Sequence, residues 1–453
     1  MKKRFLLVTS VLLIAVQLLA ACAQPPAPTP TQAATVEAQP PAEATGGVDW
    51  DAYSGTTLHL LMNKHAYTDT IAKFTDEFTA LTGIKIVVDS YSQDEFMNKR
   101  LVDFSSGVGT YDFTMMDQAT PQYARAGWIE DLGPYFENAN LVDAAAYDIN
   151  DIASLFLSQF TVDGKVYAIP VAGEAQIIYY RSDIFEEKGL EPPKTFDELL
   201  SLAQALKTDT MPGICVRGQK IHTVSNSTGV IWSYGGRIMD DPNFPKHAVF
   251  NSPEAVQAVD LYAKLAREYG PPGVANYTWQ ECVSDFQQGK VPMYLDVSVF
   301  MSQLEDPTKS TVSGKIGYAP MPAGPAGSYP NGGSWAVSIN SASQNKEAAF
   351  LFLSWITSKE MQLRIAEDAG LTSRQSVLDA PVLAEKFPAE WLAAFKTNMA
   401  ATLPEMNFPP ITRIDEFMDI YGGAVNAVIL GESDAQTALD AAVIKVDELL
   451  ASE

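Results

Sequence analysis

Several residue types and motifs are scarce or missing in this sequence of 453 residues. Its four histidines stand apart at positions 59, 65, 222 and 247, which argues against a metal cluster. The phosphate loop GxxxxGK(S/T), the zinc motif HExxH and the nucleophile elbow GxSxG are all missing. We therefore expect neither a metal nor a cofactor, and no motif supports an enzyme.

Positive charge is also scarce. Lys and Arg together number 31 against 55 Asp and Glu, which gives a formal net charge of −24 at pH 7. A chain this acidic, with no basic cluster, is a poor candidate for binding nucleic acid or anionic lipid surfaces. We expect no nucleic-acid partner, and the charge suits solubility outside the cell.

The apolar run at the N-terminus is short. Three basic residues at positions 2–4 precede an apolar stretch over residues 5–19, and Leu-Ala-Ala-Cys then ends at Cys22. This order is typical of an export signal, and the run is shorter than the roughly 20 residues of a membrane-spanning helix. The last four residues resemble the bacterial lipobox, which implies a signal peptide over 1–21 and a lipid anchor on Cys22. Ordinary signal cleavage near Ala21 is the alternative.

The segment after Cys22 is rich in Pro, Ala and Thr and has no apolar periodicity. Such a composition does not bury enough apolar surface to fold, and its prolines keep it extended. We predict that residues 22–55 form a lipidated tether. The roughly 400 residues that follow exceed one compact core and favour two domains or lobes.

Two cysteines remain if Cys22 is lipidated. Cys215 and Cys282 can form one disulfide in an oxidising compartment, but the sequence does not fix the distance between them. Their pairing stays open.

The folded part begins with alternating strand and helix patterns. Residues 57–62 read as a strand, and residues 69–82 as a helix that Gly83 stops. Its apolar face is predicted to hold Ile71, Phe74, Phe78 and Leu81. Further elements are expected at 84–88 (strand), 93–106 (helix), 111–116 (strand) and 121–126 (helix). This alternation predicts an α/β fold that binds ligands at the carboxyl ends of its strands.

The second half of the chain continues in the same way. Strand patterns occupy 167–170 and 175–180, and Thr195 with Glu198 forms a capping-box pattern before a helix over 196–207. Later helices are predicted at 253–268, 345–357 and 435–450. The predicted strands and helices are numerous enough to form two lobes.

Many segments, by their order and spacing, resemble family 1 of the extracellular solute-binding proteins of ATP-binding-cassette importers. The group includes maltose-, glycerol-phosphate- and polyol-binding members. The matching segments are YDFTMMDQ (111–118), AGWIEDL (126–132), YAIPVAGEAQIIYYRSDIFEEKGLEPPKTFDEL (167–199), GGRIMD (235–240), FQQGKVPMYLD (286–296) and SWAVSINSASQNKEAAFLFLSWITS (334–358). Within the group, GICVRG (213–218) and YGPPGVANYTW (269–279) look most like the sorbitol- and mannitol-binding branch.

The resemblance implies a two-lobed periplasmic-binding-protein fold, type II-like, with the ligand cleft between lobes that close about a hinge. It places residues 56–165 with 334–385 in an N-terminal lobe, and 166–333 with 386–453 in a C-terminal lobe. The implied function is to capture a small neutral sugar or polyol outside the cell and deliver it to ABC permease subunits. The implied protein is a monomer, lipid-anchored to the bacterial cell membrane at the cell surface or in the periplasm.

Three alternatives remain open. The same fold serves a sensor kinase or chemoreceptor instead of a permease. A glycerol-phosphate-type solute would require two or more converging basic groups. A secreted glycosidase would require paired carboxylates, such as Asp117 and Glu174, on either side of one bond.

A polyol site needs carboxylates and amides for hydroxyls, and flat aromatic rings for C–H faces. Asp117 and Gln118 follow a predicted strand at its carboxyl edge, although a capping role competes for Asp117. Glu174 matches a Gly-Glu pair of the polyol branch, with a structural salt bridge as its alternative. The family pattern places a solute-facing carboxylate at Asp296.

The aromatic and basic candidates complete the predicted site. His65 and Tyr67 lie in the first loop, which contacts solute in this fold, and a solvated loop is the alternative. Arg374 is a hydroxyl donor or a partner in an ion pair. The aromatic candidates, for which core packing is the alternative, are Trp232, Tyr277, Trp279 and Trp335.

Overall fold

The computed structural model describes residues 47–370, 372–403 and 408–452. The predicted signal peptide and Cys22 lie outside the described residues. Within them, no helix combines the length and the apolar character that crossing a bilayer requires.

Seven strands form one sheet with the order β2-β1-β3-β9-β6-β7, in which β8 also pairs with β6. Strands β1, β2 and β3 are parallel to one another, whereas β9, β7 and β8 join by antiparallel pairing. A separate two-stranded sheet holds β4 and β5. The strands are β1 (Thr57–Asn63), β2 (Lys85–Tyr91), β3 (Phe113–Met116), β4 (Thr161–Val162), β5 (Lys165–Val166), β6 (Ile169–Arg181), β7 (Met293–Val297), β8 (Ile316–Pro320) and β9 (Gly332–Ile339).

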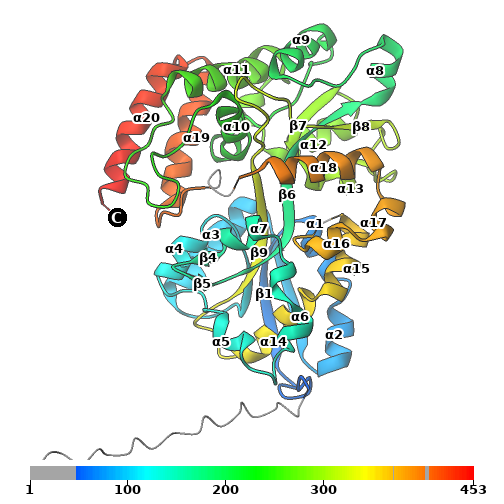
Figure 1. The fold of residues 1–453 in the computed structure, drawn as a ribbon, viewed down its shortest axis with the longest axis vertical. Helices are drawn as coiled ribbons and strands as arrows, with labels where there is room; N and C mark the ends of the chain where they lie inside the picture. The colour runs from blue at the N-terminus through cyan, green and yellow to red at the C-terminus, as the bar shows by residue number, and fades with distance from the viewer. Residues whose placement is uncertain (1–46, 371, 404–407, 453) are drawn as a thin grey trace, which may run out of the picture. The chain divides into compact units, whose positions relative to one another are not determined.

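Strand β6 joins two parts of the main sheet, one that contains β9 and one that contains β7 and β8. Its residues 169–175 pair with β9, and its residues 176–180 pair with β7. The sequence predicted two strands here, at 167–170 and 175–180. That prediction is wrong because the intervening residues continue the ladder with β9, across a register shift between Pro170 and Ala172. In Figure 1, β6 and β9 run side by side between the group of elements around β1 and α14 and the group around α10 and α19.

Helices cover the sheet on both groups of strands (Figure 1). They are α1 (Ala66–Ile71), α2 (Thr75–Thr82), α3 (Gln93–Ser106), α4 (Thr120–Arg125), α5 (Gly133–Phe136), α6 (Ala144–Tyr147), α7 (Ser154–Gln159), α8 (Ser182–Lys188), α9 (Phe196–Leu206), α10 (Lys220–Tyr234), α11 (Pro253–Tyr269), α12 (Trp279–Gln287), α13 (Met301–Leu304), α14 (Lys346–Ile356), α15 (Lys359–Ala369), α16 (Gln375–Leu378), α17 (Pro381–Lys386), α18 (Ala389–Ala401), α19 (Ile414–Leu430) and α20 (Ala435–Leu450). Short 3-10 turns are η1 (Ile149–Asp151), η2 (Val274–Asn276) and η3 (Ser298–Phe300).

Local sequence signals account for several helix boundaries. Both hydrogen bonds of the predicted capping box between Thr195 and Glu198 are present at the start of α9. Gly83 ends α2 with φ at 72°, in the left-handed conformation that glycine adopts without a steric penalty. The predicted bounds of α3 and α20 match those of the structure.

The single helix predicted over 69–82 is two helices, α1 and α2. The amides of Lys73 and Phe74 donate to carbonyls only three residues back, so the chain tightens between the two helices. This turn rotates α2 relative to the expected apolar face. Phe78 is buried as predicted, but Leu81 is 43% exposed, which corrects its expected place in the core.

Two large cores flank the shared strand. One surrounds β1 and α14 and includes Leu60, Phe113 and Phe352. The other surrounds α10 and α19 and includes Val230 and Tyr421. These cores hold the strand ends that carry the polar residues of the site.

The folded part begins before residue 56. The amide of Asp49 donates to the carbonyl of Asn140 at 2.8 Å, and Trp50 and Tyr53 pack on the first core. The aromatic side chains supply apolar area that the preceding residues lack, so residues 48–55 do not belong to the tether to which the sequence assigned them.

Cys215 and Cys282 are joined by a disulfide, with their Cα atoms 5.7 Å apart. This resolves the pairing that the sequence left open. Both residues are fully buried.

Candidate functional site

A cavity of about 130 Å³ lies beside the paired strands β6 and β9, where they pass from one core to the other. Polar side chains and aromatic rings alternate around it, as a site for a small polyhydroxylated ligand requires. It is lined by Asn63, His65, Gln93, Asp117, Gln118, Glu174, Arg217, Ile221, His222, Ser225, Trp279, Val297, Val299, Phe300, Gln303, Asn331, Gly333, Ser334, Trp335, Phe408 and Met418.

One wall is formed by the carboxyl ends of two parallel strands. Asn63 ends β1, and Asp117 with Gln118 follows β3, which pairs with β1. Both Asn63 and Asp117 are buried, and the Oδ1 of Asn63 and the Oδ2 of Asp117 have no hydrogen-bond partner among the described residues. Buried acceptors without donors favour a ligand that supplies hydroxyl protons.

Asp117 also has a structural role. Its Oδ1 accepts from Nη2 of Arg100 at 2.8 Å and from the amide of Ala119 at 3.0 Å. The capping role that competed for this residue is therefore present, and it leaves the second carboxylate oxygen free.

Glu174 lies on β6 and pairs with His65 across the cavity. The Nδ1 of His65 accepts from the amide of Tyr67 at 3.1 Å, so the ring proton resides on Nε2. Nε2 then donates to Oε1 of Glu174 at 3.2 Å. This bond orients the carboxylate and leaves its other oxygen available to a ligand.

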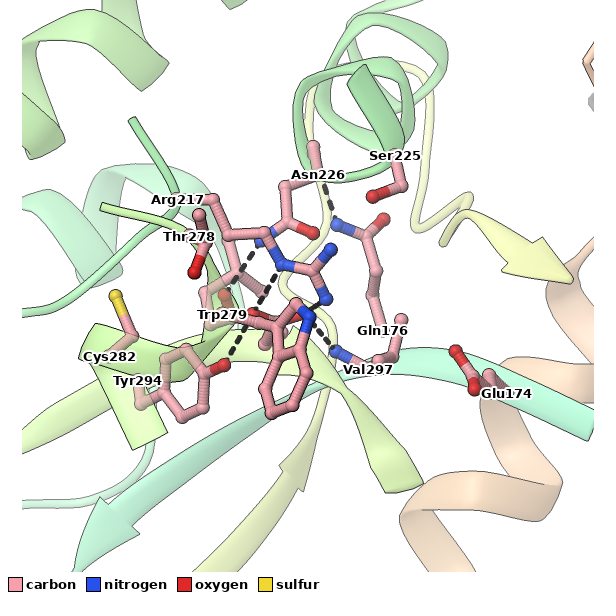
Figure 2. Close-up of polar contacts among 12 residues, drawn as sticks. Glu174, Gln176, Arg217, Ser225, Asn226, Thr278, Trp279, Cys282, Tyr294 and Val297 are labelled. Carbon is pink, nitrogen blue, oxygen red and sulfur yellow. Dashed lines mark hydrogen bonds and ion pairs between the residues drawn. The ribbon is translucent and has the colours of Figure 1, made fainter. Parts of the chain in front are cut away.

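Arg217 provides the cationic group of the opposite wall, and Asp296 holds it in place. The carboxylate of Asp296 accepts from Nε and Nη2 of Arg217, at 2.8 and 2.5 Å. It also accepts from the hydroxyl of Tyr294 and the amide of Val297. Asp296 is fully buried and its acceptors are filled, so the solute-facing position predicted for it is taken by Arg217 (Figure 2).

Aromatic rings bound the cavity on two sides. Trp279 stacks on Phe300 with ring centroids 5.2 Å apart, and its Nε1 donates to Oε1 of Gln93 at 3.2 Å. Trp335 lies 5.9 Å from the ring of His65 and 6.2 Å from that of Phe96. These rings offer apolar faces to the C–H groups of a polyol.

Six of the eleven predicted site residues line the cavity, and five do not. The six are His65, Asp117, Gln118, Glu174, Trp279 and Trp335. Of the others, Asp296 lies behind Arg217, Tyr67 is buried in the first core, and Trp232 lines a different cavity of about 260 Å³. The carbonyl of Tyr277 accepts from the amides of Gly218 and Gln219.

Arg374 is buried in an ion pair away from the cavity. Its Nη1 lies 3.3 Å from Oδ2 of Asp151 and donates to the carbonyl of Asp148, and its Nε donates to the carbonyl of Thr357. Of the two roles predicted for Arg374, hydroxyl donor and ion-pair partner, the structure therefore shows the ion pair.

Sequence reasoning missed several lining residues, chiefly Asn63, Gln93, Arg217 and His222. Asn63 follows the first predicted strand, a position that could have been read in the same way as Asp117. Arg217 lies in the segment GICVRG, which carried the resemblance to the polyol branch. His222 lies on α10 and had no signal beyond its residue type.

His222 is a buried, neutral histidine. Burial lowers its pKa to about 4, the nearby charge of Arg217 acts in the same direction, and Asp94, 3.7 Å away, opposes them. A neutral imidazole can both donate to and accept from solute hydroxyls.

The free energy of unfolding is therefore expected to fall as the pH drops from 6.5 to about 4. In that window the unfolded chain takes up a proton at residue 222 that the folded chain does not. Between pH 7 and pH 4, His222→Gln should lose less stability than the wild type, by on the order of 2 kcal/mol. Urea unfolding at the two pH values measures the difference.

His247→Gln is the matched control because His247 is 68% exposed. It should retain the pH dependence of the wild type. Identical pH dependence in His222→Gln and the wild type would contradict a buried neutral histidine.

The charges around the cavity are largely compensated. Arg217 is paired with Asp296, and Asp117 with Arg100. Among the described residues, no group of three or more His, Cys, Asp and Glu side chains is arranged to hold a metal ion. The remaining carboxylate, Glu174, makes a bound anion unfavourable.

Comparison with known families identifies the class of protein. The model of the bacterial extracellular solute-binding proteins matches residues 65–363. The chain belongs to this family, which confirms the resemblance found in its sequence. It has the expected two-lobed periplasmic-binding fold, and its place of action is outside the cytoplasm.

Several similar proteins are named for a polyol or were solved with one bound. The erythritol/L-threitol-binding protein of Mycolicibacterium smegmatis is 29% identical over 84% of this chain and 85% of its own. The mannitol-binding protein of Pseudomonas aeruginosa is 27% identical over 77% and 83%. A solved ABC-transporter solute-binding protein from Agrobacterium radiobacter K84, in complex with ribitol, is 31% identical with a TM-score of 0.79, over 87% and 99%.

Proposed function

We propose that the protein captures a short acyclic sugar alcohol outside the cell and delivers it to the permease of an ABC importer. The observation that carries the proposal is a pair of buried acceptors in the cavity, on Asn63 and Asp117, that have no hydrogen-bond partner among the described residues. Glu174, which is bonded to His65 through one oxygen, and the donor Arg217 line the same cavity. Each hydroxyl of a polyol can donate to one of these groups and accept from another. Relatives named for erythritol, mannitol and ribitol support the same class of solute.

A phosphorylated solute fits this cavity less well. It brings charged oxygens that need several cationic donors. In the described residues that line the cavity, the arginine is Arg217, and its charge is already paired with Asp296. A glycerol-phosphate-type solute would also face Glu174 and Asp117.

The proposed lobes are residues 56–165 with 334–385, and 166–333 with 386–453. Support comes from β6, whose two halves pair with different strands, and from the packing of α18 against β8 and β6. In this proposal β6 and β9 connect the lobes and the cavity lies between them.

The proposal includes a lipid anchor at Cys22, a tether that ends before Asp49, and a monomer without catalytic activity. The lipobox-like sequence supports the anchor, and at least two acyl chains would hold the protein stably on the membrane. A binding protein of this class needs only to close over its solute and release it to the permease.

Calorimetric titration of the purified protein with erythritol, ribitol, D-mannitol, maltose, glycerol 3-phosphate and glycine tests the proposal. We expect binding of at least one alditol and none of the phosphate ester or the amino acid. In a melting experiment, a solute at 100 times its Kd should add about 2.7 kcal/mol to the stability of the protein. Binding of glycerol 3-phosphate alone would contradict the proposed solute class, and tighter binding of maltose than of any alditol would replace it with a disaccharide.

A further inference from the structure

The cavity wall that carries Arg217 and Trp279 is built from two segments far apart in the sequence. Residues 215–219 form one segment, and residues 277–282 form the other, which includes the start of α12. Cys215 lies two residues before Arg217, and Cys282 lies three residues after Trp279. The disulfide between these cysteines joins the two segments directly beside the site.

Hydrogen bonds tie the two segments at their other ends. The amides of Gly218 and Gln219 both donate to the carbonyl of Tyr277 at 2.9 Å. The segments are thus linked at 218–277 by backbone hydrogen bonds and at 215–282 by a covalent bond. Arg217 and Trp279 lie between the two links.

The two cavity-lining side chains depend on different parts of the surrounding structure. Arg217 is fixed by Asp296 on β7, and the first segment is bonded to β7 through Cys215, whose amide donates to the carbonyl of Met293 at 2.9 Å. Trp279 instead begins α12, where it stacks on Phe300. Besides these contacts, the attachment of α12 to the first segment contributes to the distance between guanidinium and indole.

Figure 2 labels Arg217, Trp279, Tyr294 and Cys282 in one view. Arg217 and Trp279 both face Phe300: the guanidinium carbon lies 6.0 Å from the centroid of that ring, and the indole stacks on it. The disulfide sulfurs are remote from solvent, since both cysteines are fully buried. The disulfide joins residues that are 67 positions apart in the sequence. Without it, α12 would be held against this wall by non-covalent contacts alone.

We propose that the Cys215–Cys282 disulfide is a positioning crosslink of the solute site, which fixes Trp279 relative to Arg217 and thereby sets solute affinity. This inference rests on the proposed function, because it concerns the same cavity. A crosslink that favours the binding geometry increases affinity by reducing the disorder that the solute must remove.

The test compares the full chain, purified in detergent, with two double variants, C215A/C282A and C215S/C282S. Both remove the crosslink but leave different side chains, so a shared effect belongs to the crosslink. The Kd for erythritol, ribitol and D-mannitol is measured by calorimetry at a temperature where melting curves show each protein folded. We expect Kd to rise about tenfold in both variants, a typical size for coupling between two sites.

A second preparation keeps both sulfur atoms in place. Because the disulfide is buried, dithiothreitol is added to the wild-type chain unfolded in urea, where it reduces the disulfide to two thiols and is itself oxidised to a cyclic disulfide. The chain is then refolded with dithiothreitol present, which is a second route to the protein without its crosslink. It should show the same rise in Kd, while dithiothreitol should leave the affinity of the double variants unchanged. A lower melting temperature with unchanged Kd would overturn the proposal and leave the disulfide a role in stability alone.

A measurement without solute separates this inference from the proposed function. Hydrogen exchange of the amides of Gly218, Gln219 and α12 should be at least about tenfold faster without the crosslink, because local opening of this wall becomes easier. If no alditol binds to any form, the proposed function fails and the exchange rates alone decide. Equal exchange with and without the crosslink would overturn the positioning role.

Discussion

Arg217→Met is expected to raise the Kd for the bound alditol about 100-fold, because a hydrogen bond to a charged group contributes about 1.5–3 kcal/mol and the hydroxyl it served loses its partner. Methionine keeps much of the side-chain volume and removes the guanidinium. The Nη1 of Arg217 has no partner among the described residues, and in the proposed function it is the donor to the solute. Calorimetric titration measures the change.

Arg237→Met is the matched control. Arg237 is exposed and lines the separate cavity near Trp232, so its replacement should leave Kd unchanged. Equal affinities for the wild type and Arg217→Met would remove Arg217 from the solute site.

Combining Arg217→Met with Asp296→Asn separates the effect on solute affinity from the effect on protein stability. Arg217→Met alone leaves the buried carboxylate of Asp296 without its cation and should lower the free energy of unfolding by about 3–5 kcal/mol. R217M/D296N should regain most of that loss, because no buried charge remains: the amide oxygen can still accept from the amide of Val297, and the NH2 group can donate to the hydroxyl of Tyr294. Its affinity should stay as low as that of the single variant. Recovery of affinity in the double variant would show that stability, not the donor, controls binding.

Arg374→Met is expected to do the opposite of R217M/D296N. Its free energy of unfolding should be lower by about 3–5 kcal/mol, and the Kd of the alditol should be unchanged. The guanidinium is fully buried, pairs with Asp151 and donates to the carbonyls of Asp148 and Thr357. Its removal takes the cation away from the buried carboxylate of Asp151, which keeps only the donors of Ser376 among the described residues, and removes the donor to the carbonyl of Thr357. None of these groups lines the cavity. Urea unfolding and calorimetry measure the two quantities.

Arg364→Met provides the comparison on the surface. Arg364 pairs with Glu77, which is half exposed, and such a pair contributes at most about 1 kcal/mol. A loss comparable to that of Arg374→Met would contradict the difference in burial as its cause. A weaker solute affinity in Arg374→Met would return Arg374 to the binding site.

Much of the fold was predictable because its local signals are strong. The ends of α3 and α9 follow capping residues and apolar periodicity, which act within a few residues of sequence. The break between α1 and α2 was not predictable, since both helices share one apolar period and the tight turn depends on tertiary packing. The continuity of β6 was missed for a related reason: its ladder partner, β9, lies more than 150 residues further along the chain.

Site residues were predictable where the end of a strand determines their position. They were not predictable where a hydrogen bond to another side chain decides whether a residue faces the cavity. Asp117 follows from the rule that ligands bind at the carboxyl ends of strands. Glu174 lies inside β6 and was predicted instead from its match to a Gly-Glu pair of the polyol branch. Asp296 also lies on a strand, but its carboxylate is saturated by Arg217, Tyr294 and a backbone amide. No sequence pattern states that a carboxylate will be filled from within the protein. The segment GICVRG pointed to the neighbourhood of Arg217, but the ion pair that orients this arginine was found only from the structure.

The position of Glu174 on the shared strand has a mechanical consequence. Glu174 belongs to the last residues of β6 that pair with β9, and from Gln176 onward the strand pairs with β7. In the proposed two-lobed protein, a rotation of one lobe against the other would bend β6 where its partner changes, near Glu174. A solute bound to that carboxylate therefore resists the bending directly, so the energy that holds the solute and the stiffness that keeps the protein closed arise at the same point of the backbone.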